Sequence, residues 1–248
     1  MVSSMVGQGG GVLYTPIQVW FGSNIRQAAT TSLFLIIVLS ISSAITYAKS
    51  RRVDWPLAIV LESATTLSAF IGAIFSSRIK EDILLLILAG AITSAALPLL
   101  LDIERKHIEK SCRGGLTSWL RNTDNRQYCI NLFVAIPVSI GAGLISGMVG
   151  VGGGILKVAA MVLLLGVPVD IAIASSSIMV GITATGGFTG HLLNETWDLK
   201  KAIPLAIVVF TGAQIGSRIS VGLDKKRLEK ILGWLLLAIA AVTIVNIF

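Results

Sequence analysis

A glycine-rich run interrupts an apolar stretch of this chain and limits what the chain can fold into. Residues 147–156 read Gly-Met-Val-Gly-Val-Gly-Gly-Gly-Ile-Leu, inside an apolar segment that extends from 130 to 165. A near-copy, Met-Val-Gly-Gln-Gly-Gly-Gly-Val-Leu, occupies residues 5–13. Glycine clusters break helices. Helices broken at matching places in two halves of a membrane protein point to a transport site.

The composition predicts an all-α polytopic membrane protein. Hydrophobic residues make up 54% of the 248 residues and charged residues 13%, about half the charge that soluble domains carry. Several apolar runs reach about 20 residues, the length that crosses a bilayer. We therefore expect a multi-pass protein of the cell (plasma or inner) membrane. The net charge of +7 fits basic cytoplasmic loops rather than a nucleic-acid partner.

About eight hydrophobic segments are separated by polar residues, and together they suggest two repeats. They lie near 1–21, 28–48, 56–77, 82–101, 130–165, 169–192, 201–221 and 228–248. The division predicts a first membrane repeat at 1–101, a polar linker at 102–128 and a second membrane repeat at 129–248. Further landmarks recur in the same order: Gly22 with Gly166, Ala29-Thr30-Thr31-Ser32 with Ala174-Ser175-Ser176-Ser177, and Ser77-Arg78-Ile79 with Ser217-Arg218-Ile219.

The distribution of basic residues favours inverted repeats. If the two glycine-broken segments fold back on the side from which they enter, each repeat crosses the membrane three times. The loops on one side then hold 14 Lys and Arg residues and those on the other hold 5. The positive-inside rule puts the richer side, with the linker, in the cytoplasm. The cysteines Cys112 and Cys129 are then interpreted as free cytoplasmic thiols, and no metal site or cofactor is expected.

The glycine breaks are the first candidates for a substrate site. A helix that begins inside the membrane has free N–H groups and a partial positive charge that suit an anion. Such a break must face a protein-lined cavity, although small residues also serve close helix packing. The expected substrate-binding residues here are Gly7, Gln8, Gly9, Gly10, Gly11, Gly150, Gly152, Gly153 and Gly154.

Two charged residues lie well inside apolar segments. Lys157 follows the second glycine run and suggests a cation for an anionic substrate, unless it extends to the membrane interface. Tyr14 stands at the matching position of the first repeat. Glu62 is an acidic residue well inside an apolar segment, and it can pair with Lys157, relay a proton that couples transport, or serve structure alone.

Hydroxyl triplets stand near the starts of two segments. Thr30, Thr31 and Ser32 match Ser175, Ser176 and Ser177. Their hydroxyls can donate to an oxyanion, or they can bond back to their own helix. We include all six among the expected substrate-binding residues.

Enzyme motifs are not found in the sequence: no Gly-x-Ser-x-Gly, no His-Glu-x-x-His and no nucleotide-binding loop. We expect no enzyme but a secondary transporter of small anions. The alternatives are a non-transporting scaffold or assembly protein, whose small residues serve packing, and an anion channel. The sequence leaves the oligomeric state open.

The glycine runs, the Ala-Thr-Thr-Ser and Ala-Ser-Ser-Ser turns and the two Ser-Arg-Ile sequences resemble the TauE/SafE family of sulfite exporter-like membrane proteins. The resemblance covers nearly the whole chain outside 102–128. It implies two four-segment repeats and the transport of small sulfur-containing anions such as sulfite, thiosulfate or sulfonates. Lys157 stands where the resemblance implies an apolar or small residue, which bears on the choice of substrate.

Overall fold

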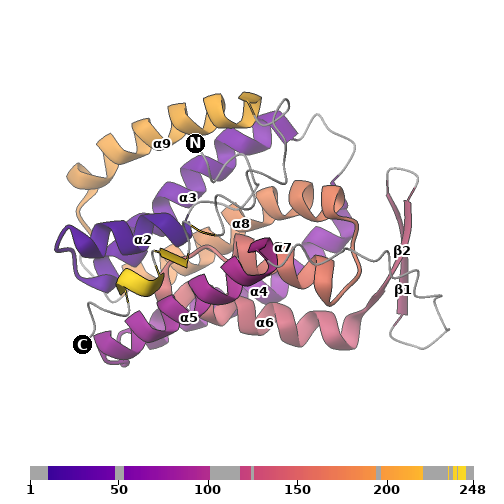
Figure 1. The fold of residues 1–248 in the computed structure, drawn as a ribbon, viewed down its shortest axis with the longest axis horizontal. Helices are drawn as coiled ribbons and strands as arrows, with labels where there is room; N and C mark the ends of the chain where they lie inside the picture. The colour runs from indigo at the N-terminus through magenta and orange to yellow at the C-terminus, as the bar shows by residue number, and fades with distance from the viewer. Residues whose placement is uncertain are drawn as a thin grey trace.

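The computed structural model describes residues 11–47, 53–100, 118–123, 126–193 and 197–219, with short stretches between 234 and 243. Within them the chain forms a helical bundle with a hairpin at one end (Figure 1). The elements run in the order α2 (Gly11–Trp20), α3 (Ile25–Tyr47), α4 (Trp55–Ser76), α5 (Glu81–Leu100), β1 (Ser118–Thr123), β2 (Arg126–Asn131), α6 (Leu132–Val149), α7 (Gly154–Leu163), α8 (Val169–Leu192) and α9 (Leu199–Ile219).

Three of the described helices are long and apolar enough to cross a membrane. The spans are Ile25–Ser42 in α3, Trp55–Ser76 in α4 and Leu132–Val149 in α6. A shorter apolar helix covers Ala202–Ile215 within α9. Many large hydrophobic side chains on these helices are exposed, for example Ile59 at 65% and Val208 at 67%. An apolar exterior of this kind suits lipid rather than water.

The second glycine run breaks the apolar segment as the sequence predicts. Helix α6 ends at Gly150 (φ 73°), and α7 begins after Gly153 (φ 69°). Gly152 between them also has a positive φ of 74°. Side chains with a Cβ atom rarely adopt this left-handed conformation, so the glycines themselves set the break. The first run, residues 5–10, lies outside the described residues; its last glycine, Gly11, starts α2.

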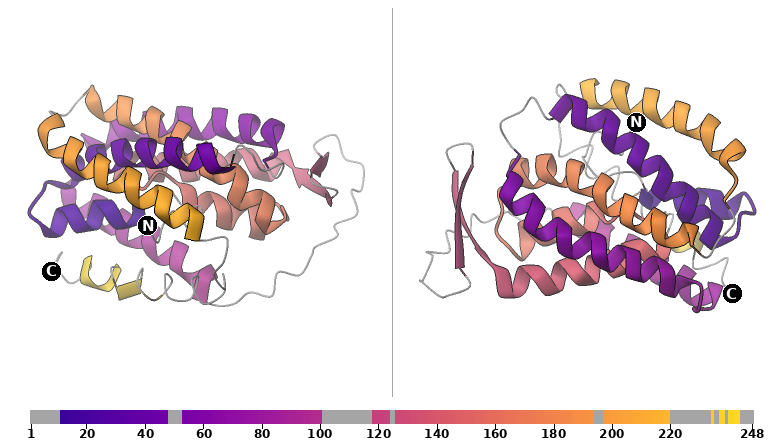
Figure 2. Two further views of the ribbon diagram at one scale, coloured as in Figure 1. Left: turned by 90° about the horizontal axis from the view of Figure 1, so that it is seen from above. Right: turned by 180° about the vertical axis from the view of Figure 1, so that it is seen from behind.

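The fold is mostly helical, as predicted, and the described residues also contain one β-hairpin that the sequence analysis does not predict. Strands β1 and β2 pair antiparallel, with Ser118 opposite Asn131 and Thr123 opposite Arg126. The hairpin lies at one end of the bundle (Figure 2) and carries Trp119, Tyr128 and Ile130 into the core beneath it. These three apolar side chains lie on the same side of the two strands and form a buried face of the hairpin. The polar linker predicted for this part of the chain would have no such face.

Cys129 on β2 is disulfide-bonded. The expectation of a free thiol is therefore wrong at this position. The other cysteine of the sequence, Cys112, lies outside the described residues. Disulfides persist mainly in oxidising compartments, so this bond favours a position of the hairpin outside the cytoplasm. The count of basic residues favours the cytoplasmic side instead.

Corresponding helices of the two proposed repeats have similar lengths. Helices α2 and α7 have 10 residues each, α3 and α8 have 23 and 24, and α4 and α9 have 22 and 21. Gly22 (φ 85°) and Gly166 (φ 67°) share a left-handed backbone between the first two helices of each set. The packing is also reciprocal, because α4 packs on α8 and α9 packs on α3. These matches support the proposal of a duplicated chain.

Helices α4 and α6 approach closely because glycines line their contact. A Cβ atom on Gly147 would lie 2.0 Å from the Ala69 carbonyl oxygen, and one on Gly72 would lie 2.4 Å from the Leu144 oxygen. Gly143 is equally tight against the Thr65 oxygen at 2.4 Å. Small residues at such spacing let membrane helices pack backbone to backbone. The contact fixes α4 against the helix that leads into the glycine break.

Candidate functional site

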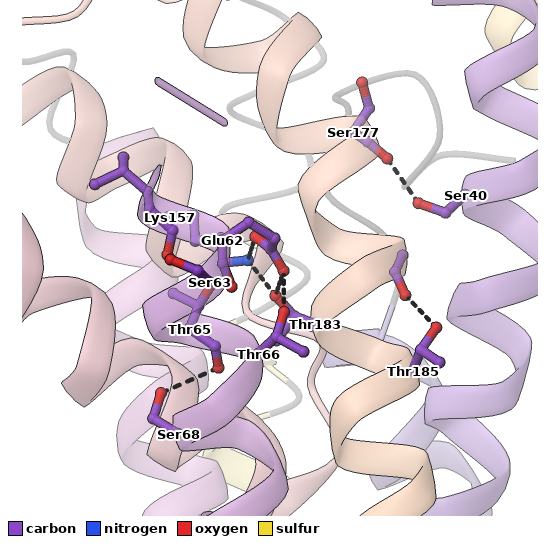
Figure 3. A network of polar contacts seen from close by, with 12 residues as sticks. Ser40, Glu62, Ser63, Thr65, Thr66, Ser68, Lys157, Ser177, Thr183 and Thr185 are labelled. Carbon is purple, nitrogen blue, oxygen red and sulfur yellow. Dashed lines mark hydrogen bonds and ion pairs between the residues drawn. The ribbon is translucent and has the colours of Figure 1, made fainter. Parts of the chain in front are cut away.

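An ion pair between Lys157 and Glu62 lies buried inside the bundle. The Lys157 Nζ atom is 2.6 Å from Oε2 of Glu62, and the two side chains are 3% and 4% exposed. Lys157 is on α7, one turn after the glycine break, and Glu62 is on α4. Figure 3 shows the two side chains pointing toward each other across the helices. The alternative in which Lys157 extends to the interface is therefore wrong.

Two threonines complete this polar cluster. Thr183 of α8 accepts a hydrogen bond from the Lys157 ammonium and donates its own hydroxyl hydrogen to Oε1 of Glu62. Thr66, one turn after Glu62 on α4, donates to the same Oε1 over 2.9 Å. We call Glu62, Thr66, Lys157 and Thr183 the charged cluster; Figure 3 shows them together. Buried charges are tolerated only when paired and hydrogen-bonded in this way.

Two hollows meet the charged cluster from different sides. A groove of about 570 Å³ between α4 and α8 is lined by Glu62 and Thr66, with Ile59, Ser63, Leu67, Phe70, Ile182, Gly186 and Thr189. A second hollow of about 10 Å³ is lined by Lys157, with Leu61, Val138, Ser139, Ala142, Ala160, Met161, Leu165 and Met179. The two linings share no residue. The ion pair thus links a residue of one hollow to a residue of the other.

The proposed duplication of the chain does not reproduce the ion pair. Lys157 corresponds to Tyr14, and at the spacing that places Gly72 on Gly212, Glu62 falls on Ala202. Neither counterpart carries a charge. Packing alone requires no charged side chain at these two positions. An ionisable residue inside a membrane is also energetically costly, so its presence favours a functional role. The charged cluster is the strongest candidate for a functional site among the described residues.

The glycine break packs tightly beside this cluster. A Cβ atom on Gly150 would lie 2.4 Å from Cα of Ala29, and one on Gly152 would lie 2.7 Å from Cδ1 of Ile36. Gly153 lies near Ser146 and Lys157, 3.3 Å and 3.7 Å from where its own Cβ would be. The buried Ser146 hydroxyl has no hydrogen-bond partner in the described structure. Gly154 starts α7, and the preceding Gly153 gives it no side-chain cap.

Three hydroxyls of the two triplets have identified partners other than Lys157. Thr30 donates to the Arg26 carbonyl of its own helix, the local bond that the sequence left open. Ser32 is buried and accepts a hydrogen bond from Gln18 Nε2 at 3.0 Å, while Thr31 is half-buried.

The serine triplet lies toward the hairpin end of α8. Ser175 accepts from the Asp54 backbone N–H at 3.1 Å, and the Ser177 carbonyl accepts from the Ser40 hydroxyl at 2.6 Å. Ser176 between them is buried. The structure therefore brings together Lys157, Glu62 and the break at 150–154, whereas the identified hydroxyl contacts of Thr30, Ser32 and Ser175 lie outside this group. Gly7, Gln8, Gly9 and Gly10 lie outside the described residues.

A second polar cluster joins the hairpin to the start of α4. The fully buried Asp54 carboxylate receives both Nε (3.0 Å) and a terminal nitrogen (2.6 Å) of Arg121. Thr123 Oγ1 donates at 2.9 Å, the Leu57 N–H donates at 3.1 Å, and the Tyr128 hydroxyl also donates. Asp54 thus caps α4 and holds both strands.

The electrostatics of this hairpin cluster follow from its hydrogen bonds. Burial alone would raise the pKa of the Asp54 carboxyl, but the bonds from Arg121, Tyr128, Leu57 and Thr123 together hold that pKa below its usual value. Burial, and then the bond to Asp54, raises the pKa of the Tyr128 hydroxyl. Asp54 is therefore a carboxylate, and Tyr128 a neutral donor, across the neutral pH range.

Sequence reasoning missed Thr66, Thr183 and Asp54. Threonines are common in membrane helices, so the first two carry no local signal. Asp54 could have been found as a residue two positions before a helical proline, where acidic caps are frequent. Among the described residues, no group of three or more His, Cys, Asp or Glu side chains could hold a metal ion.

Apolar spans around a buried, hydrogen-bonded charge pair are compatible with a membrane transporter, and the comparisons with known proteins place the chain in that class. The model of the sulfite exporter TauE/SafE family matches residues 1–243. The chain belongs to this family, as its resemblance predicts.

Several curated relatives are membrane transporters by name. A "Probable membrane transporter protein YunE" of Bacillus subtilis is 25% identical, over 96% of this chain and 90% of that protein. A "Probable membrane transporter protein" of Xylella fastidiosa is 26% identical, over 95% and 87%. One from Methanocaldococcus jannaschii is 24% identical, over 95% and 88%. No solved structure is significantly similar to the chain.

Proposed function

We propose that this protein is a secondary transporter of small anions, and that Lys157 supplies the cation that binds them. The observation that carries the proposal is the Lys157–Glu62 pair, buried between two hollows in an apolar bundle. An ammonium group desolvated in this way attracts anions strongly once its carboxylate partner is displaced.

The position of Lys157 supports an anion rather than a cation as the proposed substrate. The side chain follows the glycine break, where the N-terminal end of α7 directs its partial positive charge and free N–H groups toward the same region. The buried Ser146 hydroxyl adds a donor beside Gly153. We propose Gly150, Gly152, Gly153, Gly154 and Lys157 as the core of the binding site.

The remaining parts of the proposal extend this core. By the duplication of the chain, Gly7, Gln8, Gly9, Gly10 and Gly11 contribute the matching break of the first repeat, and residues 30–32 and 175–177 contribute hydroxyls after a rearrangement. The repeats at 1–101 and 129–248 are inverted and rock against each other about the linker. Sulfite, thiosulfate or a sulfonate is the substrate class that the family name favours.

Uptake into proteoliposomes tests this function. Purified protein is reconstituted and assayed with radiolabelled sulfite, thiosulfate and sulfoacetate, with taurine and sulfate as competitors. We expect saturable uptake of at least one anion, abolished by Lys157→Met and retained by Lys80→Met, which removes an exposed lysine instead. Folded protein without uptake would favour the scaffold alternative, and unsaturable flux with single-channel current would favour the channel.

A further inference from the structure

We propose that Glu62 couples anion transport to protons: the transported anion displaces Glu62 from Lys157, and Glu62 then takes up one proton. This inference rests on the proposed function and names the ion that moves with the anion. The contacts of the charged cluster lead to it in three steps.

First, the anion and Glu62 compete for the same cation. Lys157 is bound to Oε2 of Glu62 at 2.6 Å and to Thr183, and its side chain is 3% exposed. An anion that binds the ammonium must replace the carboxylate, because the apolar lining of the small hollow offers it no other cation. In this structure, Glu62 therefore occupies the position on the Lys157 ammonium that the substrate anion would take.

Second, a displaced Glu62 cannot remain charged where it lies. A buried carboxylate that loses its cation costs several kcal/mol, and such a group takes up a proton instead. Its remaining neighbours are the hydroxyls of Thr66 and Thr183 on Oε1. These hydroxyls can each rotate to accept as well as donate, so they accommodate a protonated acid.

Third, the identified contacts of the other titratable groups on the surrounding helices lie outside the charged cluster. Tyr14 of α2 packs against the apolar cluster that contains Val180 and Ala184 of α8, and Glu81 of α5 pairs with Arg26. Helix α6 carries no charged residue, and α4 and α7 carry only Glu62 and Lys157. On α8, His191 and Asp170 stand eight and thirteen residues from Thr183, about 12 Å and about 20 Å along the helix. His191 also contacts the Gly147 carbonyl at 2.8 Å. Arg121 and Tyr128 of the hairpin are bound to Asp54.

The groove brings further hydroxyl groups close to Glu62. Glu62 and Thr66 line it together with the hydroxyl-bearing Ser63 and Thr189, whereas Lys157 lines the other hollow. These hydroxyls can pass a proton to Glu62 while the anion is bound to Lys157. A metal cation fits less well, because this cluster offers only the two carboxylate oxygens and two hydroxyl oxygens, fewer than the six or more that hard cations take.

The cycle balances in atoms, and the net charge that crosses is the charge of the anion plus that of one proton: zero for a monovalent anion and one negative charge for thiosulfate. Binding moves one anion onto the Lys157 ammonium and one proton onto the Glu62 carboxylate. Release of the anion lets Glu62 give up its proton and re-form the ion pair. One proton therefore accompanies each anion in the same direction, and the protein returns to its starting state.

The experiment follows anion and proton together in proteoliposomes that contain the full chain. The probe is radiolabelled thiosulfate, which stays ionised and does not cross lipid as a neutral acid, with a pH-sensitive dye inside and the voltage clamped. We expect wild-type uptake to acidify the lumen by one proton per thiosulfate, and an acid exterior to drive accumulation. Uptake without lumen acidification, or accumulation driven by sodium instead, would overturn the proposal.

Substitutions separate the role of Glu62 from a merely structural one. Glu62→Gln imitates the protonated acid, so it should keep thiosulfate exchange across the membrane while losing both lumen acidification and the response to a pH gradient. Asp82→Asn, which changes an exposed carboxylate of α5, should remain fully coupled. A Glu62→Gln protein that still moves one proton per thiosulfate would contradict the assignment.

The outcomes also separate this inference from the proposed function. Saturable, Lys157-dependent uptake without proton movement leaves the anion transporter standing and removes the coupling. Absence of uptake of every anion by folded wild-type protein removes both. Should Glu62→Gln fail to fold, the wild-type proton-to-thiosulfate ratio decides the question by itself, with Glu62→Asp expected to keep coupling because it keeps the carboxylate.

Discussion

Lys157 and Glu62 are 95 residues apart in sequence, yet their side chains form an ion pair of 2.6 Å inside the bundle. The pair joins α7, which starts at the glycine break, to α4, which packs on the helix before that break. One interaction therefore connects the two proposed repeats at the point where the chain leaves its helical path. The effect of a substitution at one of these two residues on stability should therefore depend on whether the other is intact.

A double-mutant cycle tests this coupling through stability. Lys157→Met or Glu62→Gln alone leaves a polar partner buried without its counterpart, and each should lower the free energy of unfolding by about 3–5 kcal/mol. The double variant should cost clearly less than the sum of the two, because no uncompensated charge remains. Thermal unfolding in one detergent is the measurement. Single variants as stable as the wild type would show that the pair is not formed.

The glycines of α6 give a second prediction with a built-in control. A methyl group on Gly147 would meet the Ala69 oxygen at 2.0 Å, whereas one on Gly141 would meet nothing within 4 Å. Gly147→Ala should therefore lower the free energy of unfolding by about 1–3 kcal/mol through overpacking. Gly141→Ala should be neutral or stabilising by up to about 1 kcal/mol, since alanine favours a helix. Equal effects at both sites would contradict the close α4–α6 contact.

The broken helix could be predicted from the sequence because its cause is local. Three glycines within four residues permit the left-handed backbone found at Gly150, Gly152 and Gly153, and no distant partner is needed. The pairing of Lys157 with Glu62 was one of the roles that the sequence left open. Intramembrane charges require partners, and few candidates stand within apolar segments.

The other contacts depend on three-dimensional neighbours that the sequence does not reveal. The bridging role of Thr183 arises because α8 crosses beside both α4 and α7, and a threonine in a helix carries no sign of this. The hairpin was missed because its Lys- and Arg-containing surroundings resemble a solvated linker. Its anchor, Asp54, stands 67 residues before Arg121.

Arg121 gives the third prediction. It holds the Asp54 carboxylate with two hydrogen bonds and lies 4.7 Å from the centre of the Trp119 ring. Lysine cannot reproduce the paired geometry, so Arg121→Lys should loosen the hairpin and raise its rate of hydrogen exchange. Arg26→Lys is a control at another arginine, which binds backbone carbonyls and pairs more loosely with Glu81, at 3.6 Å. Unchanged protection of residues 118–131 in Arg121→Lys would show that the anchor is weaker than the geometry indicates.

The pH dependence of Asp54 gives the fourth prediction. Its pKa is lowered in the folded protein, so its contribution to stability is complete above the unfolded value, about 4, and is lost as the pH falls through the folded value. The difference in unfolding temperature between wild type and Asp54→Asn should therefore be constant near neutral pH and shrink in acid below about pH 4. A difference that grew on acidification would have the wrong sign for a carboxylate held by Arg121.

The state of Cys129 gives the last prediction and addresses the orientation of the chain. Because Cys129 is disulfide-bonded, it should not react with a maleimide in unreduced membranes and should react after reduction. The variant with both Cys112→Ser and Cys129→Ser is the control for labelling elsewhere, because Cys129→Ser alone leaves the second cysteine of the sequence as a reactive thiol. Labelling by a membrane-impermeant maleimide then reports the side. Reaction from outside the cell would place the hairpin in the oxidising compartment that a disulfide favours. It would contradict the orientation predicted from the distribution of basic residues. Reaction only after permeabilisation would support the cytoplasmic side that the basic residues favour. Ready labelling without any reductant would instead show a free thiol and remove the disulfide from the argument.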